Sequence, residues 1–406
     1  MDKAEISDVV IVGAGLAGAS LALALSGHGL YIQLIEATDL SGYSLPSDRD
    51  LNSFDLRVSA LTPRSVKMLA RLGAWDAIKD YRHCPYTHMV VWDAEGTGKI
   101  EFDSSLVGAS ELGNIVENRA LVSELLNQIE RRGDISLTAS DKLENAATSG
   151  AENILSITLS SGKKINTRLL VAADGVRSKV RELMGFSTTE WDYDQQAIVA
   201  TVQTEKYHEA TAWQRFSATG PLAFLPLPGK ENSHFCSIVW SCDNWLAEEL
   251  ISLDDQQFCK RLAAEFEFTL GDVLGVSDRA FFPLRQSNAV SYFKPLVALV
   301  GDSAHSIHPL AGQGLNIGLL DVDVLSEELL IAHNSDIEIG SLEVLARYQR
   351  RRRGENLQMM LAMEGFKRLF GSKKVPLRWL RNEGLRNVDK MQWVKKRVIN
   401  YAMGLA

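Results

Sequence analysis

The sequence VGDSAHSIHPLAGQGLN, residues 300–316, sets the expected fold of this chain. An apolar run typical of a buried strand ends just before Asp302, and a loop with Pro309 and Gly312 follows. An apolar helix is expected to begin near Leu315. The first N–H groups of a helix have no partner within it and carry partial positive charge, so this arrangement suits the anionic end of a cofactor.

A second region of the same kind opens the chain. Residues 6–12 predict a buried strand and residues 16–26 an alanine- and leucine-rich helix. The turn that joins them contains Gly13, Ala14, Gly15, Leu16, Ala17 and Gly18. Glycines at this spacing allow a tight turn, close approach of a pyrophosphate and close packing of a helix on a strand. Glu36 follows 18 residues after Gly18, where a carboxylate accepts hydrogen bonds from an adenosine ribose. Together these features predict a dinucleotide site; the alternative is a glycine-rich turn in an ordinary α/β protein.

Three further positions are candidate cofactor contacts only in combination with these two regions. An apolar strand ends in Asp174-Gly175 before a basic helix, and such a turn also occurs as plain punctuation between elements. Arg57 is a candidate contact for a cofactor phosphate or ring, with a surface charge as the alternative. Arg119 opens a predicted helix, where it contacts a cofactor or pairs with Glu117 or Glu124.

Composition excludes several classes of protein. The chain has 406 residues, of which 46% are hydrophobic and 23% charged, enough for a large core and two interleaved domains. A net charge of -8 argues against nucleic-acid binding. The four cysteines show neither metal-ligand spacing nor the density of a disulfide scaffold, so we expect reduced thiols, a cytoplasmic protein and no metal site. The uncharged run Val9 to Leu25 is punctuated by glycines and lacks a basic flank, unlike a signal anchor.

Short alternating runs between residues 197 and 282 predict an antiparallel sheet inserted into the dinucleotide fold. Its aromatic residues suit one wall of an apolar pocket, or the core: Trp213, Phe216, Phe224, Phe235 and Trp240. Helices are expected beyond Asn316, where the arginine run 350–353 is interpreted as a solvated face.

The C-terminal tail is basic. Residues 373–406 hold nine basic and two acidic residues, a net charge of +7, which leaves -15 for the rest of the chain. One helical stripe of this tail is apolar: Met391, Val394, Val398, Tyr401, Ala402 and Leu405. The pattern predicts a basic amphipathic helix that docks on a membrane surface or packs on the acidic body of the protein.

The order of the three motifs, a glycine-rich turn, Asp174-Gly175 and Gly301-Asp302, resembles that of flavin-dependent aromatic hydroxylases with the para-hydroxybenzoate hydroxylase fold. Within that family, residues 305–316 resemble the ubiquinone-biosynthesis hydroxylases, and the nearest branch is that of the polyprenylphenol 5-hydroxylases. Supporting matches are Trp191-Asp192-Tyr193, Phe224-Leu225-Pro226-Leu227, Ser237-Ile238-Val239-Trp240-Ser241 and Tyr401-Ala402-Met403-Gly404-Leu405.

The resemblance implies an α/β fold: a Rossmann-like FAD-binding domain, an inserted antiparallel β-sheet substrate domain and a C-terminal helical region. The expected boundaries are 1–80, 106–182 and 284–335 for the FAD-binding domain, 81–105 and 183–283 for the substrate domain, and 336–406 for the helical region with its basic tail.

The resemblance also implies roles for single residues. The glycine turn and Glu36 hold the ADP part of FAD, Asp302 holds the ribityl and pyrophosphate region, and Arg57 and Arg119 assist. The remaining expected cofactor contacts are Asp174 and Gly175, shared by FAD and NADPH, Gly301 and Gly312 in the late loop, Pro309 beside the flavin ring, and the peptide N–H groups near Gly314, Leu315 and Asn316 at its pyrimidine edge. The residue that helps deprotonate the phenol stays unknown, because His305 and His308 are equally suited to holding the loop.

The implied activity is NADPH-dependent hydroxylation, with O2, of the ring of a polyprenylphenol intermediate in ubiquinone biosynthesis, at C5, through a flavin C4a-hydroperoxide. A lipid substrate gives the basic tail a purpose as a peripheral contact with the inner face of the membrane. Alternatives are hydroxylation at another ring position or of a soluble phenol, a prenyl-chain reductase, a halogenase, and a flavin-binding assembly protein. The sequence leaves open the choice of NADPH over NADH, the prenyl chain length, and whether the protein forms a homo-oligomer or joins other biosynthetic enzymes.

Overall fold

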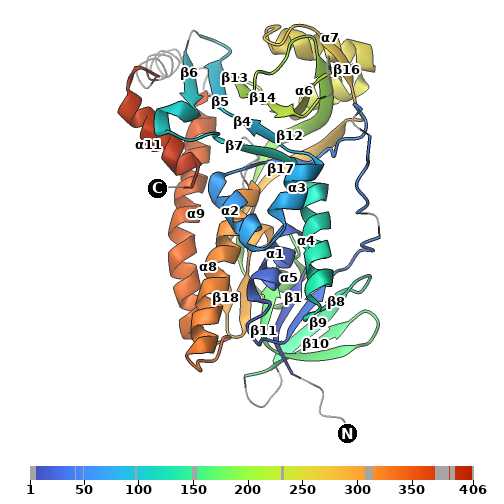
Figure 1. The fold of residues 1–406 in the computed structure, drawn as a ribbon, viewed down its shortest axis with the longest axis vertical. Coiled ribbons are helices and arrows are strands. Elements are labelled where there is room, and N and C mark those ends of the chain that lie inside the picture. The colour runs from blue at the N-terminus through green and yellow to red at the C-terminus, as the bar shows by residue number, and fades with distance from the viewer. Residues whose placement is uncertain are drawn as a thin grey trace.

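Two large β-sheets form the framework of the protein, one above the other in Figure 1. The computed structural model describes residues 6–41, 43–48, 50–96, 98–148, 153–229, 233–306, 314–370, 384 and 389–404. Helices α1, α4, α8 and α9 lie around the lower sheet, and α6 and α7 cover the upper one (Figure 1).

The lower sheet has eight described strands in the order β18-β19-β11-β1-β2-β8, with β10 and β9 extending it beside β11. They are β1 (Ser7–Val12), β2 (Ile32–Ile35), β8 (Ile135–Thr138), β9 (Leu143–Thr148), β10 (Leu155–Leu159), β11 (Lys164–Ala172), β18 (Phe293–Lys294) and β19 (Val297–Leu299). The pairs of β1 with β2 and β11, of β2 with β8 and of β11 with β19 are parallel. Parallel strands need crossover helices that cover the sheet, which explains why β1 is apolar on both faces.

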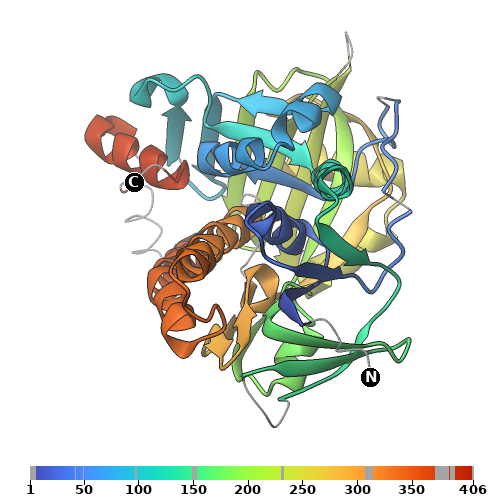
Figure 2. The same cartoon turned by 60° about the horizontal axis from the view of Figure 1, so that its bottom comes forward.

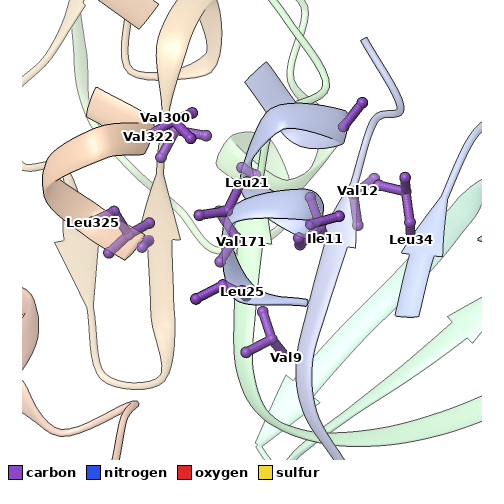
Figure 3. Packing of buried hydrophobic residues seen from close by; sticks show 14 of the residues in the cluster. Val9, Ile11, Val12, Leu21, Leu25, Leu34, Val171, Val300, Val322 and Leu325 are labelled. Atoms are coloured by element: carbon purple, nitrogen blue, oxygen red, sulfur yellow. The ribbon is translucent and has the colours of Figure 1, made fainter. Parts of the chain in front are cut away.

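The core of this lower layer joins segments from both ends of the chain. Val9, Ile11 and Val12 of β1 pack against side chains of α1, β2, β11 and α8, and Figure 3 labels these together with Leu21, Leu25, Leu34, Val171, Val300, Val322 and Leu325. Helix α1 (Leu16–Leu25) lies between α4 (Asn118–Arg132) and α8 (Gly314–Asn334), as Figure 2 shows. The N-terminal strand–turn–helix unit and the late helix therefore form one body.

The upper sheet contains nine described strands in the order β20-β17-β12-β15-β14-β13-β5-β6, with β16 beside β12. They are β5 (His88–Asp93), β6 (Lys99–Asp103), β12 (Thr188–Thr204), β13 (Thr211–Ser217), β14 (Gly220–Leu227), β15 (His234–Asp243), β16 (Val273–Val276), β17 (Ala280–Ala289) and β20 (His305–Ser306). Its pairs are antiparallel except that of β5 with β13.

One face of the upper sheet packs against α6 (Asn244–Ser252) and α7 (Asp255–Glu265). Phe224 and Trp240 are fully buried on that face. Of the two interpretations of these residues, pocket wall or core, the structure supports the core for this pair: side chains alternate between the faces of a strand, and both point into the core below the helices. Phe235 belongs to a different cluster on the opposite face.

A third, small sheet lies between the two large ones and has the order β3-β7-β4. Its strands are β3 (Val58–Leu61), β4 (Cys84–Tyr86) and β7 (Gly113–Glu117); the helices nearby in the chain are α2 (Pro63–Arg71), α3 (Trp75–Tyr81) and the 3-10 turn η1 (Ser104–Val107). Two short elements complete the middle of the chain: α5 (Lys179–Leu183) and the 3-10 turn η2 (Gly301–Ser303).

The C-terminal part is helical, as predicted, with α8, α9 (Leu342–Phe370) and α11 (Gln392–Ala402). The face of α11 that packs on the protein is formed by Lys395, Ile399 and Met403, with Ile399 and Met403 in a cluster with Leu112. The predicted apolar stripe lies beside that face and is not the part that packs; Leu405 falls outside the described residues. Within the described part of the chain, no helix combines the length and apolar character needed to cross a bilayer. The exact division into domains stays a prediction.

Candidate cofactor site

The glycine turn after β1 is closed by backbone contacts that only glycine permits. Gly13 has φ +102°, and a Cβ atom there would lie 2.4 Å from the carbonyl oxygen of Ala173. A Cβ atom on Gly18 would lie 1.8 Å from the carbonyl oxygen of Gly13. A Cβ atom on Gly15 would meet nothing within 4 Å. The first and last glycines are therefore required by the fold, whereas Gly15 leaves space for a ligand.

Glu36 lies at this turn, as its position in the sequence predicts. Its Oε2 accepts a hydrogen bond of 2.8 Å from the N–H of Ala14, and its Oε1 accepts two from Thr38. Helix α1, which contains Leu16 and Ala17, begins after Gly15 with no side-chain cap. Its first N–H groups are thus left to water or to a ligand.

The three motifs, far apart in sequence, meet at this turn. A Cβ atom on Gly13 would lie 2.9 Å from the Cα of Asp174, and one on Gly301 would lie 3.3 Å from the Cβ of Ala17. Helix α8 joins them, because a Cβ atom on Gly318 would lie 3.3 Å from the Cα of Gly301. The glycine turn, the Asp-Gly motif and the Gly-Asp motif therefore lie side by side, and together they form the candidate cofactor site.

Asp174, which lies beside Gly13 in the cofactor site, caps helix α5. Its Oδ2 accepts hydrogen bonds from the N–H groups of Lys179 (2.7 Å) and Val180 (3.2 Å), while its buried Oδ1 has no partner in the described residues. Gly175, with φ +79°, turns the chain between them. Helix α5 in turn holds η2, because Nη1 of Arg181 donates to the carbonyl oxygen of Ser303 at 2.9 Å.

Arg57 is close enough to Asp302 to lower the pKa of its carboxyl group. The Asp302 side chain is accessible to solvent, yet protein atoms crowd around it, and this desolvation raises the pKa of its carboxyl group. Electrostatic interactions with His305 and Arg57 oppose the rise. The Asp302 side chain is therefore available to a ligand, within electrostatic reach of Arg57.

The start of α8 is fixed by the side chain of Asn316, which is 4% exposed. Its Nδ2 donates to the carbonyl oxygen of Ala60 at 2.7 Å, and its Oδ1 accepts from the N–H of Thr62 at 3.0 Å and the hydroxyl of Ser65 at 2.7 Å. The side chain is therefore used inside the protein. The predicted role of the N–H groups at Gly314, Leu315 and Asn316 concerns the backbone and stays a prediction. Pro309, Gly312 and His308 lie outside the described residues.

Arg119 makes the predicted pairing with Glu117. Its Nη2 lies 3.4 Å from Oε2 of Glu117 and donates to the carbonyl oxygen of Ser53 at 3.1 Å. Its Nε is buried and has no partner among the described atoms. Glu124, the other proposed partner, binds Gln128 and Arg131 on its own helix. A cofactor contact by Arg119 remains untested.

A buried charged network that contacts Gly301 was not predicted from the sequence. Asp321 of α8 is fully buried and accepts from the N–H of Gly301 (3.1 Å), from Nε of Arg352 (2.9 Å) and from Nδ2 of Asn356 (3.2 Å), and it lies 2.5 Å from Nε2 of His305. Burial alone would raise the pKa of Asp321, but the charges and hydrogen bonds of His305 and Arg352 lower it to about 2.

This network shows that the interpretation of residues 350–353 as a solvated face was wrong in part, and it also indicates the role of His305. Arg352 is 1% exposed, so the arginine run is not a uniformly solvated face; its neighbours Arg350, Arg351 and Arg353 are exposed. The spacing Tyr348, Arg352, Asn356 is a helical stripe that continues the apolar face of α9, and that stripe was the available signal. Since Nε2 of His305 is taken by Asp321, this histidine holds the loop rather than facing a substrate.

These residues fit the phosphate and ribose parts of a dinucleotide. The turn offers space at Gly15 and free N–H groups at the start of α1, and beside it Asp174 has a buried carboxylate oxygen without a partner among the described residues. Anions bind well at such a helix start.

Comparison with known proteins assigns the family. The sequence model of the family described as FAD binding domain matches residues 6–360. The chain belongs to this family. This FAD-binding protein is 34% identical over 399 residues to the 3-demethoxyubiquinol 3-hydroxylase of Escherichia coli K12, covering 98% of this chain and 99% of the relative. It is 35% identical over 448 residues to the mitochondrial ubiquinone biosynthesis monooxygenase COQ6 of Xenopus tropicalis, covering 98% and 93%.

The fold of this FAD-binding protein is also found in a solved structure. The p-nitrophenol 4-monooxygenase PnpA from Pseudomonas putida DLL-E4 superposes with a TM-score of 0.77 at 18% identity, covering 99% of this chain and 98% of that one. The predicted fold class, the membership among ubiquinone-biosynthesis hydroxylases and the class of flavin-dependent monooxygenase are confirmed.

Proposed function

We propose that this chain uses FAD, NADPH and O2 to hydroxylate the aromatic ring of a polyprenylphenol intermediate in ubiquinone biosynthesis. The observation that supports this most directly is that the glycine turn, Asp174-Gly175 and Gly301-Asp302 lie side by side. The named relatives, which match nearly the whole chain, support the ubiquinone pathway as its context.

We assign a part of FAD to each group of residues in the cofactor site. The glycine turn and the start of α1 bind the pyrophosphate, Glu36 the adenosine ribose and Asp302 the ribityl chain. FAD, when bound, supplies hydride acceptance from NADPH and the activation of O2. The N–H groups at the start of α8 face the pyrimidine edge, where fixed donors stabilise negative charge. Arg57 and Arg119 assist, and Asp174-Gly175 contacts both cofactors.

The proposed ring position is C5. The E. coli relative is named for position 3, so the product has to decide between the two. We would incubate FAD-loaded protein with NADPH, a short-chain polyprenylphenol and ¹⁸O2 and analyse the product by mass spectrometry. One labelled oxygen on the ring is expected, and fragmentation locates it. Oxidation of NADPH that yields only hydrogen peroxide would contradict the proposed substrate, and bound FAD without any NADPH oxidation would favour an assembly protein.

A peripheral membrane contact through α11 is part of this proposal. Trp393, Val398 and Tyr401 are 69%, 43% and 47% exposed on a helix that also carries Lys396 and Arg397. Such a helix lies in the interface of an anionic bilayer, with its apolar side chains inserted and its cations at the headgroups. A substrate with a polyprenyl chain resides in that bilayer.

A further inference from the structure

A small hollow lies on the face of the upper sheet that is turned away from α6 and α7. Its lining residues are Ala60, Tyr86, Met89, Ala212, Trp213, Gln214, Ala223 and Leu225. Since Trp213 packs toward α6 and α7, the side chains of its neighbours Ala212 and Gln214 point to the opposite face. The sheet therefore presents Gln214 toward the small sheet, which contributes Ala60 and Tyr86 to the hollow.

Small side chains create this hollow and the fold fixes its position. Gln214 pairs across strands with Ala223, and Ala212 lies on the same face of the sheet. These two small side chains leave space around the amide group of Gln214. Ala60 of β3 lies opposite. Its carbonyl oxygen is held by the side chain of Asn316 at 2.7 Å. The hollow is thus next to the strand to which the start of α8 is tied.

Two polar side-chain groups line the hollow, the amide of Gln214 and the hydroxyl of Tyr86. Gln214 is 5% exposed, and across the described residues its side-chain amide makes no hydrogen bond. The hydroxyl of Tyr86 likewise has no partner among them, and burial raises the pKa of Tyr86 to about 12, which keeps it a neutral donor. Neither group is fully enclosed by protein, so both reach the space of the hollow, where a bound oxygen atom can take the place of water beside Gln214.

The lining holds no charged residue. Arg215, next along β13, points to the other face and pairs with Glu265 (2.5 Å) and Glu267 (3.2 Å). A carboxylate placed in this hollow would lose its hydration without meeting a cation, whereas a neutral hydroxyl or methoxy group would meet Gln214. In this structure the hollow measures about 20 Å³, so a ring enters only when a side chain rotates; Met89, flexible and unbranched, is suited to that movement.

We infer that this hollow binds the aromatic ring of the substrate, and that Gln214 is a specificity-determining residue that hydrogen-bonds a neutral oxygen substituent and disfavours rings with a carboxylate. The inference rests on the proposed function and adds to it the chemical class of ring and the residue that reads it.

The test compares Gln214→Leu with the wild type on two ligands, a short-chain 2-polyprenylphenol and the matching polyprenylbenzene without the hydroxyl group. Binding is measured without NADPH from the change in the absorbance of bound flavin, and hydroxylation from KM and kcat. We expect the variant to bind the phenol roughly tenfold more weakly, the effect of one hydrogen bond to a buried group. Wild type and variant should bind the benzene equally, and the affinity for FAD should not change.

Gln203→Leu is the matched control, because Gln203 lies on β12 of the same sheet and does not line the hollow. A second variant, Gln214→Arg, should raise the affinity for a polyprenylated hydroxybenzoate relative to the phenol. Equal phenol binding by wild type and Gln214→Leu, or an equal loss on both ligands, would overturn the inference. Phenol binding that depends on Gln214 without any labelled product would support this site while refuting the proposed hydroxylation. A wild type that binds neither ring would refute both.

Discussion

Gly15 and Gly18 differ in what they contribute: Gly15 leaves space for the cofactor, whereas Gly18 is required for folding of the turn. At Gly15 the backbone has φ -69° and open space, so Gly15→Ala should leave the stability of the protein within about 0.5 kcal/mol of the wild type. Its affinity for FAD should fall at least tenfold, because the methyl group occupies the approach of the pyrophosphate. Isothermal titration of apoprotein with FAD and thermal unfolding measure the two effects.

Gly18→Ala is the paired variant. Its methyl group meets the Gly13 carbonyl oxygen at 1.8 Å, so both the stability and the affinity for FAD should decline. If Gly15→Ala binds FAD as tightly as the wild type, the pyrophosphate does not lie at this turn.

His208 gives stability a dependence on pH. The ring is 2% exposed; its Nδ1 accepts from the N–H of Ala210 and its Nε2 lies 3.1 Å from the carbonyl oxygen of Leu227. Burial lowers the pKa of His208 to about 4. The unfolded chain, with a pKa of about 6.5 at this position, binds the extra proton first, so stability falls as pH decreases from about 6.5 to 4, by up to about 3 kcal/mol.

Urea unfolding at several pH values tests this. His208→Gln should flatten the decline below pH 6.5, while the partly exposed control His333→Gln should follow the wild type. Parallel curves for wild type and His208→Gln would show that another group is responsible.

At the scale of elements, Asp321 ties α8, α9 and η2 together. Asp321→Asn removes the carboxylate charge that pairs with the buried Arg352 and lies beside the buried His305, and it should cost about 3–5 kcal/mol of stability. Asp323→Asn is a matched control on the same helix, because Asp323 pairs with the partly exposed Arg64 and Arg71, where a pair contributes at most about 1 kcal/mol.

The measurement is the urea midpoint of the FAD-loaded protein, followed by circular dichroism and flavin fluorescence. Arg352→Met in the Asp321→Asn background should recover part of the loss, because it removes the unpaired cation. Equal midpoints for the two aspartate variants would mean that the network does not carry stability.

The elements around the cofactor site were predictable where their signal is local. The strand, glycine turn and helix at the N-terminus follow from a few adjacent residues, and so does the strand that ends before Gly301. The burial of Arg352 was not predictable in this way, because its partner Asp321 lies 31 residues earlier on another helix. The face of Phe224 depends on which side α6 and α7 cover, which the alternation of β14 alone does not specify.

The same limit applies to the cofactor site. Gly13 to Gly18 and Glu36 were found because one short motif carries them, and the structure does bring them together. The hollow at Gln214 combines β13 with Ala60 and Tyr86, more than a hundred residues earlier in the chain. No window of sequence contains that juxtaposition.

At the scale of the whole molecule, the hollow and helix α11 are neighbours. Tyr86 and Met89 line the hollow and also pack against the cluster that holds Ile399 and Met403 of α11. A single layer of side chains therefore separates the proposed ring site from the helix proposed to lie on the bilayer.

This arrangement predicts how chain length and membrane binding are linked. Replacing Trp393, Val398 and Tyr401 together by serine should weaken binding to anionic vesicles at least tenfold in a sedimentation assay, because three exposed apolar side chains no longer insert. FAD binding and KM for a short, water-dispersed polyprenylphenol should not change, whereas KM for a long-chain substrate in vesicles should rise. Trp245→Ser, at a tryptophan 59% exposed on α6, is the control and should bind vesicles as the wild type does. Unchanged vesicle binding by the triple variant would show that α11 is not the docking surface, and weaker binding without a rise in the long-chain KM would separate docking from substrate capture.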